Sequence, residues 1–419
     1  MRNLPPKARL GIVAVVVALV LGGAVYALFL RGGDDAPVSE AGSRFSDKSG
    51  GASGAPLSAK ELASAKSAKT GSDPAPPSED EIKDSPGAAV AGLLLVGFRG
   101  TLRDTPFLKR LAAIPYGGLL LTEANYEQPQ QLSGLTSKLQ EVAREAGHPA
   151  PLIAAKQEGG EFNAFRNLAP EAQVDVGEGT RASIAESAKT AAQQLDALGV
   201  GVNLAPNADI SVAGGPAQGR AFSDTPAQVT SAVQATVAEY RKIGVAAAVG
   251  PFPGDGAASQ DPNAGPAPVG LSLEDLRDAD MKPFAAVAKG DTAAPAMQMT
   301  NAIYVGYDGV TPATLLPEAV KELRDGLDFD GAIISADLVA TTATAGGTVG
   351  EAAVNALKAG VDLLVIPGGR AQQDQAFRAV VAAVRSGDIS PGRIVDALKR
   401  IAGLRAFTRE TREPVRVAG

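Results

Sequence analysis

The most apolar stretch of the chain lies close to its start. Residues 10–30 contain no charged side chain, three cations precede them, and Arg31 ends the stretch. With a rise of about 1.5 Å per residue, a helix of this length crosses the roughly 30 Å hydrocarbon layer of a bilayer. The preceding cations place residues 1–9 in the cytoplasm and the remainder outside. A cleavable signal peptide ending near Val25–Ala27 is the alternative, but the apolar run is long for one.

The pattern changes after this stretch. Residues 31–87 are dominated by Gly, Ser, Ala, Pro, Asp and Lys, and large apolar residues are few. Such a composition buries too little apolar surface to offset the entropy of ordering the chain. The segment is therefore predicted to be a disordered linker between a membrane anchor and a folded domain.

Between residues 88 and 407, short apolar runs alternate with stretches of helical periodicity. The runs that are predicted to be strands are Val90–Val96, Gly118–Leu121, Leu152–Ala155, Val202–Ala205, Val245–Val249, Ala296–Met299, Ala332–Ser335 and Leu363–Ile366. The stretches that are predicted to be helices include Arg181–Leu198, Pro226–Ile243, Leu273–Ala288, Pro317–Leu327, Glu351–Ala359, Gln372–Arg385 and Arg393–Leu404. Near-continuous apolar strands separated by helices are typical of a parallel sheet covered on both faces.

Eight such units in about 320 residues favour a closed (β/α)8 barrel over an open sheet. Residues 408–419 form a predicted tail. Chemistry in this fold resides at the carboxyl ends of the strands. His148, the single histidine, precedes the third strand and so lies at the opposite end, where a solvent-exposed turn is expected.

Composition narrows the chemistry that such a barrel can perform. The chain has no Cys, one His and a net charge of −7. Without cysteine there is no disulfide, thiolate zinc site or catalytic thiol. One imidazole permits at most one His-based catalytic device. The acidic balance argues against a nucleic-acid-binding surface, and no cofactor or metal site is predicted.

Short motifs follow several of the predicted strands. In chain order they are Lys156–Gly160 (KQEGG), Asn203–Pro206 (NLAP), Gly219–Phe222 (GRAF), Phe252–Gly254 (FPG), Ser335–Leu338 (SADL) and Ala356–Asp362 (ALKAGVD). Together they resemble the barrel domain of glycoside hydrolase family 3, in the branch of bacterial β-N-acetylhexosaminidases that trim cell-wall fragments. The resemblance covers essentially all of residues 90–405.

The resemblance implies a retaining mechanism, in which an Asp directly after the Ser of the seventh-strand motif attacks the sugar. That place is held by Ala336. Asp337 follows it, but one step along a strand turns a side chain to the other face, so Asp337 could substitute only if the backbone bends. The family's Asp-His acid/base pair falls on the Asp261–Asn263 segment, where Asn263 replaces the His and Asp261 is the remaining carboxylate.

The sugar-binding positions implied by the resemblance are also altered. Lys156 stands where the family has an Asp, and Gly250–Pro251 replaces a Lys-His pair. Ala302 stands where the sixth-strand His is expected.

Other polar residues at the strand ends are retained. Arg220 and Asp209 keep their places, and Glu158 has either a structural or a ligand-binding role. Asp255 takes a loop position often held by His, where it either contacts a ligand or stabilises a turn. The candidate binding residues are therefore Arg220, Lys156, Asp209 and Asp255.

Loss of the nucleophile or the acid/base costs orders of magnitude in rate. The sequence therefore favours a catalytically inactive relative, tethered outside the cell membrane, that binds a cell-wall glycan, a muropeptide or a protein partner. The alternative is an active β-N-acetylhexosaminidase or β-glucosidase type of hydrolase that uses Asp337, Asp261 or Asp255.

Overall fold

The computed structural model describes residues 75–101 and 105–410. The expected transmembrane segment, residues 10–30, lies outside these ranges, as do most of the expected linker and residues 411–419 of the expected tail. Among the helices of the described ranges, none combines the length and the apolar character needed to cross a bilayer.

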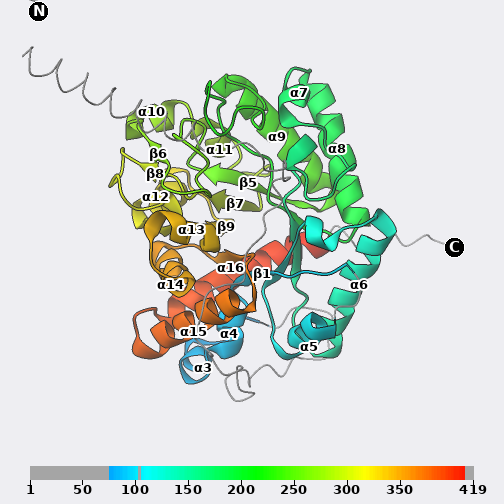
Figure 1. The fold of residues 1–419 in the computed structure, drawn as a ribbon, viewed down its shortest axis with the longest axis vertical. Coiled ribbons are helices and arrows are strands. Elements are labelled where there is room, and N and C mark those ends of the chain that lie inside the picture. The colour runs from blue at the N-terminus through cyan, green and yellow to red at the C-terminus, as the bar shows by residue number, and fades with distance from the viewer. Residues whose placement is uncertain (1–74, 102–104, 411–419) are drawn as a thin grey trace, which may run out of the picture. The chain divides into compact units, whose positions relative to one another are not determined.

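Eight parallel strands form a closed barrel, as the alternating pattern predicts (Figure 1). In barrel order they are β1 (Leu94–Gly97), β10 (Leu363–Ile366), β9 (Ala332–Asp337), β7 (Ala296–Met299), β5 (Ala246–Phe252), β4 (Val202–Asn203), β3 (Leu152–Ala155) and β2 (Gly118–Leu121). The first and last strands pair in register, Leu94 with Leu364 and Val96 with Ile366, and this pairing closes the sheet. Two short strands, β6 (Pro268–Val269) and β8 (Ile303–Tyr304), form a separate parallel pair.

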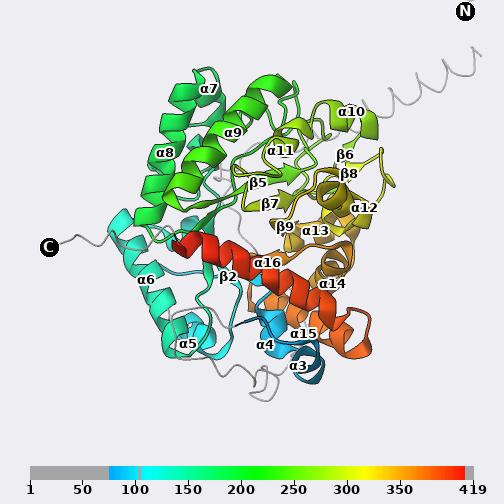
Figure 2. The same ribbon diagram turned by 180° about the vertical axis from the view of Figure 1, so that it is seen from behind.

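Helices surround the barrel on its outside (Figures 1 and 2). They are α3 (Glu79–Asp84), α4 (Gly87–Ala91), α5 (Thr105–Ala113), α6 (Pro129–Glu145), α7 (Gln173–Gly177), α8 (Arg181–Ala197), α9 (Pro226–Ile243), α10 (Leu273–Asp278), α11 (Lys282–Ala285), α12 (Pro317–Lys321), α13 (Leu338–Ala345), α14 (Val349–Ala359), α15 (Arg370–Ser386) and α16 (Pro391–Glu410). Helices cover each strand on the outside of the barrel, and side chains fill the inside. Both faces of each strand are therefore buried, which explains why its sequence is almost continuously apolar.

Several predicted boundaries differ from the structure. The apolar run 90–96 contains the end of α4 before β1 begins at Leu94, because an apolar run alone does not distinguish a buried helix from a buried strand. The helix predicted over 273–288 is two helices, α10 and α11. Pro283 lies in the first turn of α11, where a missing backbone N–H is tolerated. The helix predicted over 317–327 changes after Lys321 to a π-helical turn, Glu322–Gly326.

The barrel domain also extends beyond its predicted limits at both ends. Helix α3 lies within the stretch expected to be linker, and its Ile82 is fully buried where α3 packs against α16. A capping box between Ser78 and Glu81 starts this helix. Helix α16 continues to Glu410, past the expected domain end at residue 407. Figure 2 shows α16 crossing one end of the barrel.

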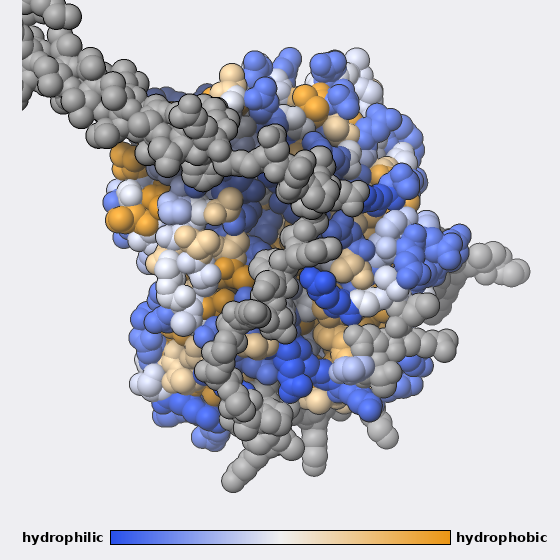
Figure 3. Space-filling view, viewed as in Figure 1, coloured by the Kyte–Doolittle hydropathy of each residue, from blue (hydrophilic) through white to orange (hydrophobic). Residues whose placement is uncertain are grey.

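Side chains of mixed character cover the face seen in Figure 3. The exposed large apolar residues of the described ranges are Val212, Val305 and Val310. Large apolar side chains of the described ranges are therefore almost all at least partly buried.

A buried carboxylate ties α16 to the barrel. Asp362, which precedes β10, has no exposed surface and lies 2.6 Å from Arg324, 3.1 Å from Arg393 and 3.6 Å from Arg400. Its Oδ2 also accepts a hydrogen bond from the backbone N–H of Ile333 in β9. Asp362 therefore joins the helix to the strands at the amino-terminal end of β10.

We expect Asp362→Ala to lower the free energy of unfolding by about 3–5 kcal/mol, because it leaves buried guanidinium groups without their counter-ion. The control is Asp388→Ala, which breaks the half-exposed Lys358–Asp388 pair and should cost less than about 1 kcal/mol. Denaturant unfolding of both variants measures the difference. Equal losses would show that Asp362 does not connect the helix to the strands.

Candidate functional site

A cavity of about 490 Å³ lies at the carboxyl ends of the strands. Residues at or directly after the ends of seven strands, β2, β3, β4, β5, β7, β9 and β10, contribute to it, because closure of the barrel brings those ends around one centre. Apolar residues at or just after the strand ends line part of the wall: Leu121, Leu204, Met299, Ala336 and Val365. Polar residues from the loops after the strands line the rest. A mixed cavity of this size at this place is the usual ligand site of a barrel.

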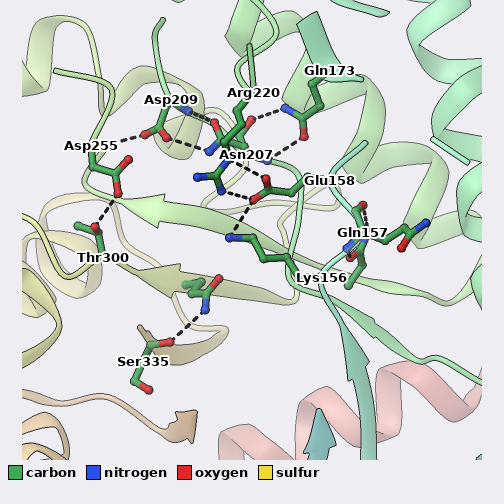
Figure 4. Close-up of polar contacts among 12 residues, drawn as sticks. Lys156, Gln157, Glu158, Gln173, Asn207, Asp209, Arg220, Asp255, Thr300 and Ser335 are labelled. Atoms are coloured by element: carbon green, nitrogen blue, oxygen red, sulfur yellow. Dashed lines mark hydrogen bonds and ion pairs between the residues drawn. The ribbon is translucent and has the colours of Figure 1, made fainter. Parts of the chain in front are cut away.

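Two cations of the polar wall, Lys156 and Arg220, hold the buried carboxylate of Glu158 between them, as Figure 4 shows. Arg220 donates from Nε and Nη2 to the two oxygens of Glu158, at 2.9 and 2.7 Å, and Lys156 Nζ lies 3.1 Å from Oε1. Burial alone would raise the pKa of Glu158, but Lys156 and Arg220 outweigh it and hold that pKa below its ordinary value. The Arg220 guanidinium also lies over the ring of Phe162, at 5.1 Å from its centroid.

Two further carboxyl groups, those of Asp209 and Asp255, lie beside the group formed by Lys156, Glu158 and Arg220. The backbone N–H of Asp255 donates to Asp209 Oδ1 at 2.7 Å, and Thr300 Oγ1 donates to Asp255 Oδ2 at 2.7 Å (Figure 4). Asn207 Nδ2 donates to the other oxygen of Asp209. Burial and the adjacent Asp255 raise the pKa of Asp209 well above its ordinary value, and burial also raises that of Asp255. Burial and the closeness of two carboxyl groups both disfavour their being ionised together.

The end of β9 bends where the resemblance places the nucleophile. Between Leu363 and Val365 of β10, the paired residues of β9 advance from Ile334 to Asp337, which is one residue more. Both Ala336 and Asp337 consequently line the cavity. The Oδ1 atom of Asp337 caps α13, since it accepts from the backbone N–H groups of Val339 and Ala340 at 2.8 and 3.1 Å. Burial nevertheless raises the pKa of Asp337.

Amide side chains lie next to this strand end. Asn301 Nδ2 donates to Asn263 Oδ1 and to the backbone oxygen of Asp337, each at 3.1 Å. Asn263 thus lies on the same wall as Ala336, as the resemblance requires. Asp261 is exposed, and its Oδ1 accepts from the backbone N–H of Asn263. An amide does not exchange protons near neutral pH, so Asn263 cannot act as the general acid.

The structure brings most of the predicted site residues to one cavity. Lys156, Arg220, Asp255, Asp261 and Asp337 line it, and Asp209 lies behind Asp255. That these residues bind a ligand or take part in catalysis stays a prediction. In the described ranges, no group of three or more acidic, His or Cys side chains is placed to hold a metal ion.

His148 differs from its prediction. It is half-buried rather than solvent-exposed, because it follows α6 and its Nε2 donates to the backbone oxygen of Ala112 at 3.0 Å. Burial lowers the pKa of His148. It does not line the cavity.

Sequence reasoning missed other contributors to the site. Asn163, Asn301 and Thr300 all line the cavity, but single amides and hydroxyls in loops carry no motif that would have identified them. Their roles depend on loop conformation, which spacing along the chain does not reveal.

Comparison with known proteins agrees with this geometry. Residues 102–404 match the description "Glycosyl hydrolase family 3 N terminal domain". The chain belongs to this family. A beta-hexosaminidase of Methylococcus capsulatus is 31% identical over 326 residues, which are 76% of this chain and 92% of the relative. The family predicted from the strand-end motifs is confirmed.

Solved structures give the same result. A family 3 β-N-acetylglucosaminidase from a Paenibacillus strain superposes with a TM-score of 0.73 at 29% identity, over 77% of this chain and 62% of the enzyme. This chain therefore spans less than two thirds of that enzyme. A β-N-acetylhexosaminidase from Beutenbergia cavernae, at 24% identity, shares the fold with a TM-score of 0.70 over 77% of this chain and 98% of its own.

The raised pKa values of Asp209 and Asp255 predict a pH dependence of stability. Because the pKa values of the pair are raised on folding, its contribution is present below the ordinary Asp pKa of about 4 and is lost as pH rises through the raised values. Asp255→Asn removes one carboxyl, and its amide can still accept from Thr300. We expect the free energy of unfolding of this variant to fall less steeply above about pH 5, by up to about 1.4 kcal/mol per pH unit.

Chemical denaturation between pH 5 and 8 measures this slope. Asp261→Asn changes an exposed carboxylate and serves as the control, with a slope equal to that of the wild type. If Asp255→Asn keeps the wild-type slope, folding does not raise the pKa values of this pair.

The helix-capping role of Asp337 predicts a specific order of stability. Asp337→Ala should lower the free energy of unfolding by about 1 kcal/mol because α13 loses its cap, whereas Asp337→Asn should change it by only a few tenths. Urea unfolding of the two variants makes the comparison. Equal stability of the Ala and Asn variants would rule out the capping role.

Proposed function

We propose that this chain is a membrane-anchored, extracytoplasmic member of glycoside hydrolase family 3 that lacks glycosidase activity. The cavity at the carboxyl ends of its strands binds a cell-wall glycan, and a partner protein is the alternative ligand. The proposal rests on the end of β9, where Ala336 occupies the nucleophile position and the Asp337 carboxylate caps α13. The names of the relatives, beta-hexosaminidase and β-N-acetylglucosaminidase, support an amino-sugar glycan as the ligand.

The chemistry of the cavity supports the loss of catalysis. A retaining glycosidase needs one carboxylate as nucleophile and a second group as acid and base. Here Asn263 and Asn301 lie beside the strand end, and Glu158 is held as a counter-ion by Lys156 and Arg220. The side chains that remain can donate and accept hydrogen bonds, which is sufficient for binding.

A second candidate function is hydrolysis by a non-standard carboxylate. It is favoured by the bend in β9, which brings Asp337 to the cavity wall, and by the presence of Asp255 in the same cavity. Burial raises the pKa of both carboxyls, which is the direction that suits a carboxyl acting as a general acid.

An assay of the purified full-length chain on chromogenic N-acetylglucosaminides and β-glucosides separates the two. We expect turnover several orders of magnitude below that of an active family member, because both reacting groups are absent. Measurable turnover that disappears in Asp337→Ala, and persists in Asp388→Ala, which lies away from the cavity, would establish the second candidate instead.

The double variant Ala336→Asp with Asn263→His tests the scaffold itself. Activity in this variant would show that the two substitutions account for the loss. Continued inactivity would show that the rest of the cavity has also diverged.

A further inference from the structure

Phe162 is an aromatic residue that lies outside the hydrophobic core. It lines the cavity, and among the described residues of that lining it is the one with an aromatic ring. Its side chain is only partly buried, and it is not one of the apolar side chains that pack in the core or against it. Phe165, three residues further on, is by contrast fully buried and packs against Tyr126. The ring of Phe162 therefore presents apolar surface that a ligand in the cavity can cover.

The backbone before Phe162 holds this ring at the cavity. Gly159 and Gly160 have φ angles of +139° and +56°, which side chains rarely adopt. A Cβ on Gly159 would lie 2.2 Å from the backbone oxygen of Glu171, and one on Gly160 would lie 2.9 Å from Cβ of Ala172. A 3₁₀ turn follows, in which the backbone N–H of Phe162 donates to the oxygen of Gly159 at 3.1 Å. The turn is thus packed closely against the chain and places the ring without contacts to the core.

Arg220 orients the same ring. Its guanidinium carbon lies 5.1 Å from the centroid of Phe162, within the range of a cation–π interaction. The guanidinium is held in turn, because its Nε and Nη2 donate to the two oxygens of the buried Glu158. A ring whose orientation is fixed before the ligand arrives loses little conformational freedom on binding.

The face of a sugar ring is complementary to such an aromatic ring. The face of a phenyl ring carries the negative part of its quadrupole, and the C–H hydrogens of a pyranose carry a small positive charge. Both surfaces are also apolar, so their contact removes apolar area from water. Polar side chains of the same lining, among them Lys156 and Glu161, are available for the hydroxyl groups at the edge of the sugar.

We propose that Phe162 is the stacking residue of the cavity, on which the C–H face of a pyranose packs against the part of the phenyl ring that Arg220 leaves uncovered. This proposal rests on the proposed function, since it names the residue that positions the glycan. The ligand class is a saccharide whose ring hydrogens form a continuous apolar face, as the axial hydrogens of a β-gluco-configured sugar do. Phe162 is then a binding residue, and Arg220 is a positioning residue that acts through it.

Proton NMR of a ligand titrated with the purified full-length chain tests the stacking directly. The ligands are methyl N-acetyl-β-D-glucosaminide and methyl β-D-glucoside. A proton held over the face of an aromatic ring is shielded by the ring current. We therefore expect upfield shifts of the C–H protons on one face of the sugar, with smaller shifts of the O-methyl protons. The glucoside should show the same pattern, because stacking does not require the acetamido group.

Variants assign the shifts to Phe162. Phe162→Leu keeps an apolar side chain but removes the ring, so the upfield shifts should disappear and Kd should rise between about two-fold and ten-fold, the range of an aromatic stacking contact. Phe162→Tyr keeps the ring and should keep both the shifts and the affinity. Because Phe162 lies outside the core, both variants should unfold close to the wild-type temperature, which thermal unfolding checks.

The matched control is Phe407→Leu. Phe407 is also partly buried and also lies beneath an arginine, Arg241, at 5.2 Å, but it does not line the cavity. This variant should keep the wild-type shifts and affinity. Binding without upfield shifts of the sugar C–H protons, or shifts that survive in Phe162→Leu or are lost equally in Phe407→Leu, would overturn the role of Phe162 and leave glycan binding intact. Absence of binding of both glycosides would reject the role of Phe162 together with the proposal that the barrel binds a glycan.

Discussion

The pairing of β1 with β10 is the constraint on which the site depends. A parallel sheet left open has two edges with unpaired backbone groups, whereas closure satisfies them and brings the carboxyl ends of the strands around one axis. The residues at those ends, from Lys156 in the third strand unit to Asp337 in the seventh, are distant in the sequence but share one cavity because of this closure.

Buried carboxylates impose the second constraint, and the chain compensates them in different ways. Asp362 is surrounded by arginines, Glu158 is held by Arg220 and Lys156, and the Asp209–Asp255 pair has raised pKa values. At the cavity, the acidic groups therefore already form ion pairs or hydrogen bonds with neighbouring side chains and with the backbone.

Some features of the site followed from the sequence because they depend on local spacing. The strands Gly118–Leu121 and Ala296–Met299 were predicted with their observed bounds, since buried parallel strands are apolar runs bounded by turns. The position of the Asp337 side chain was more difficult to predict. The sequence indicated that it would need a bend to reach the cavity, but the extra residue in β9 is visible only when that strand is paired with β10.

The sequence by itself determined the alternation of strands and helices, the family, and the identity of the residues at the strand ends, Ala336 and Lys156 among them. These depend on residue type and order, which the chain states directly. Only the tertiary structure decided which groups are in contact: that Lys156 and Arg220 share Glu158, that Asp209 faces Asp255, and that Arg220 lies over the ring of Phe162. Such contacts depend on loop conformation and on the closing of the barrel, and both are set by interactions between residues far apart in the chain.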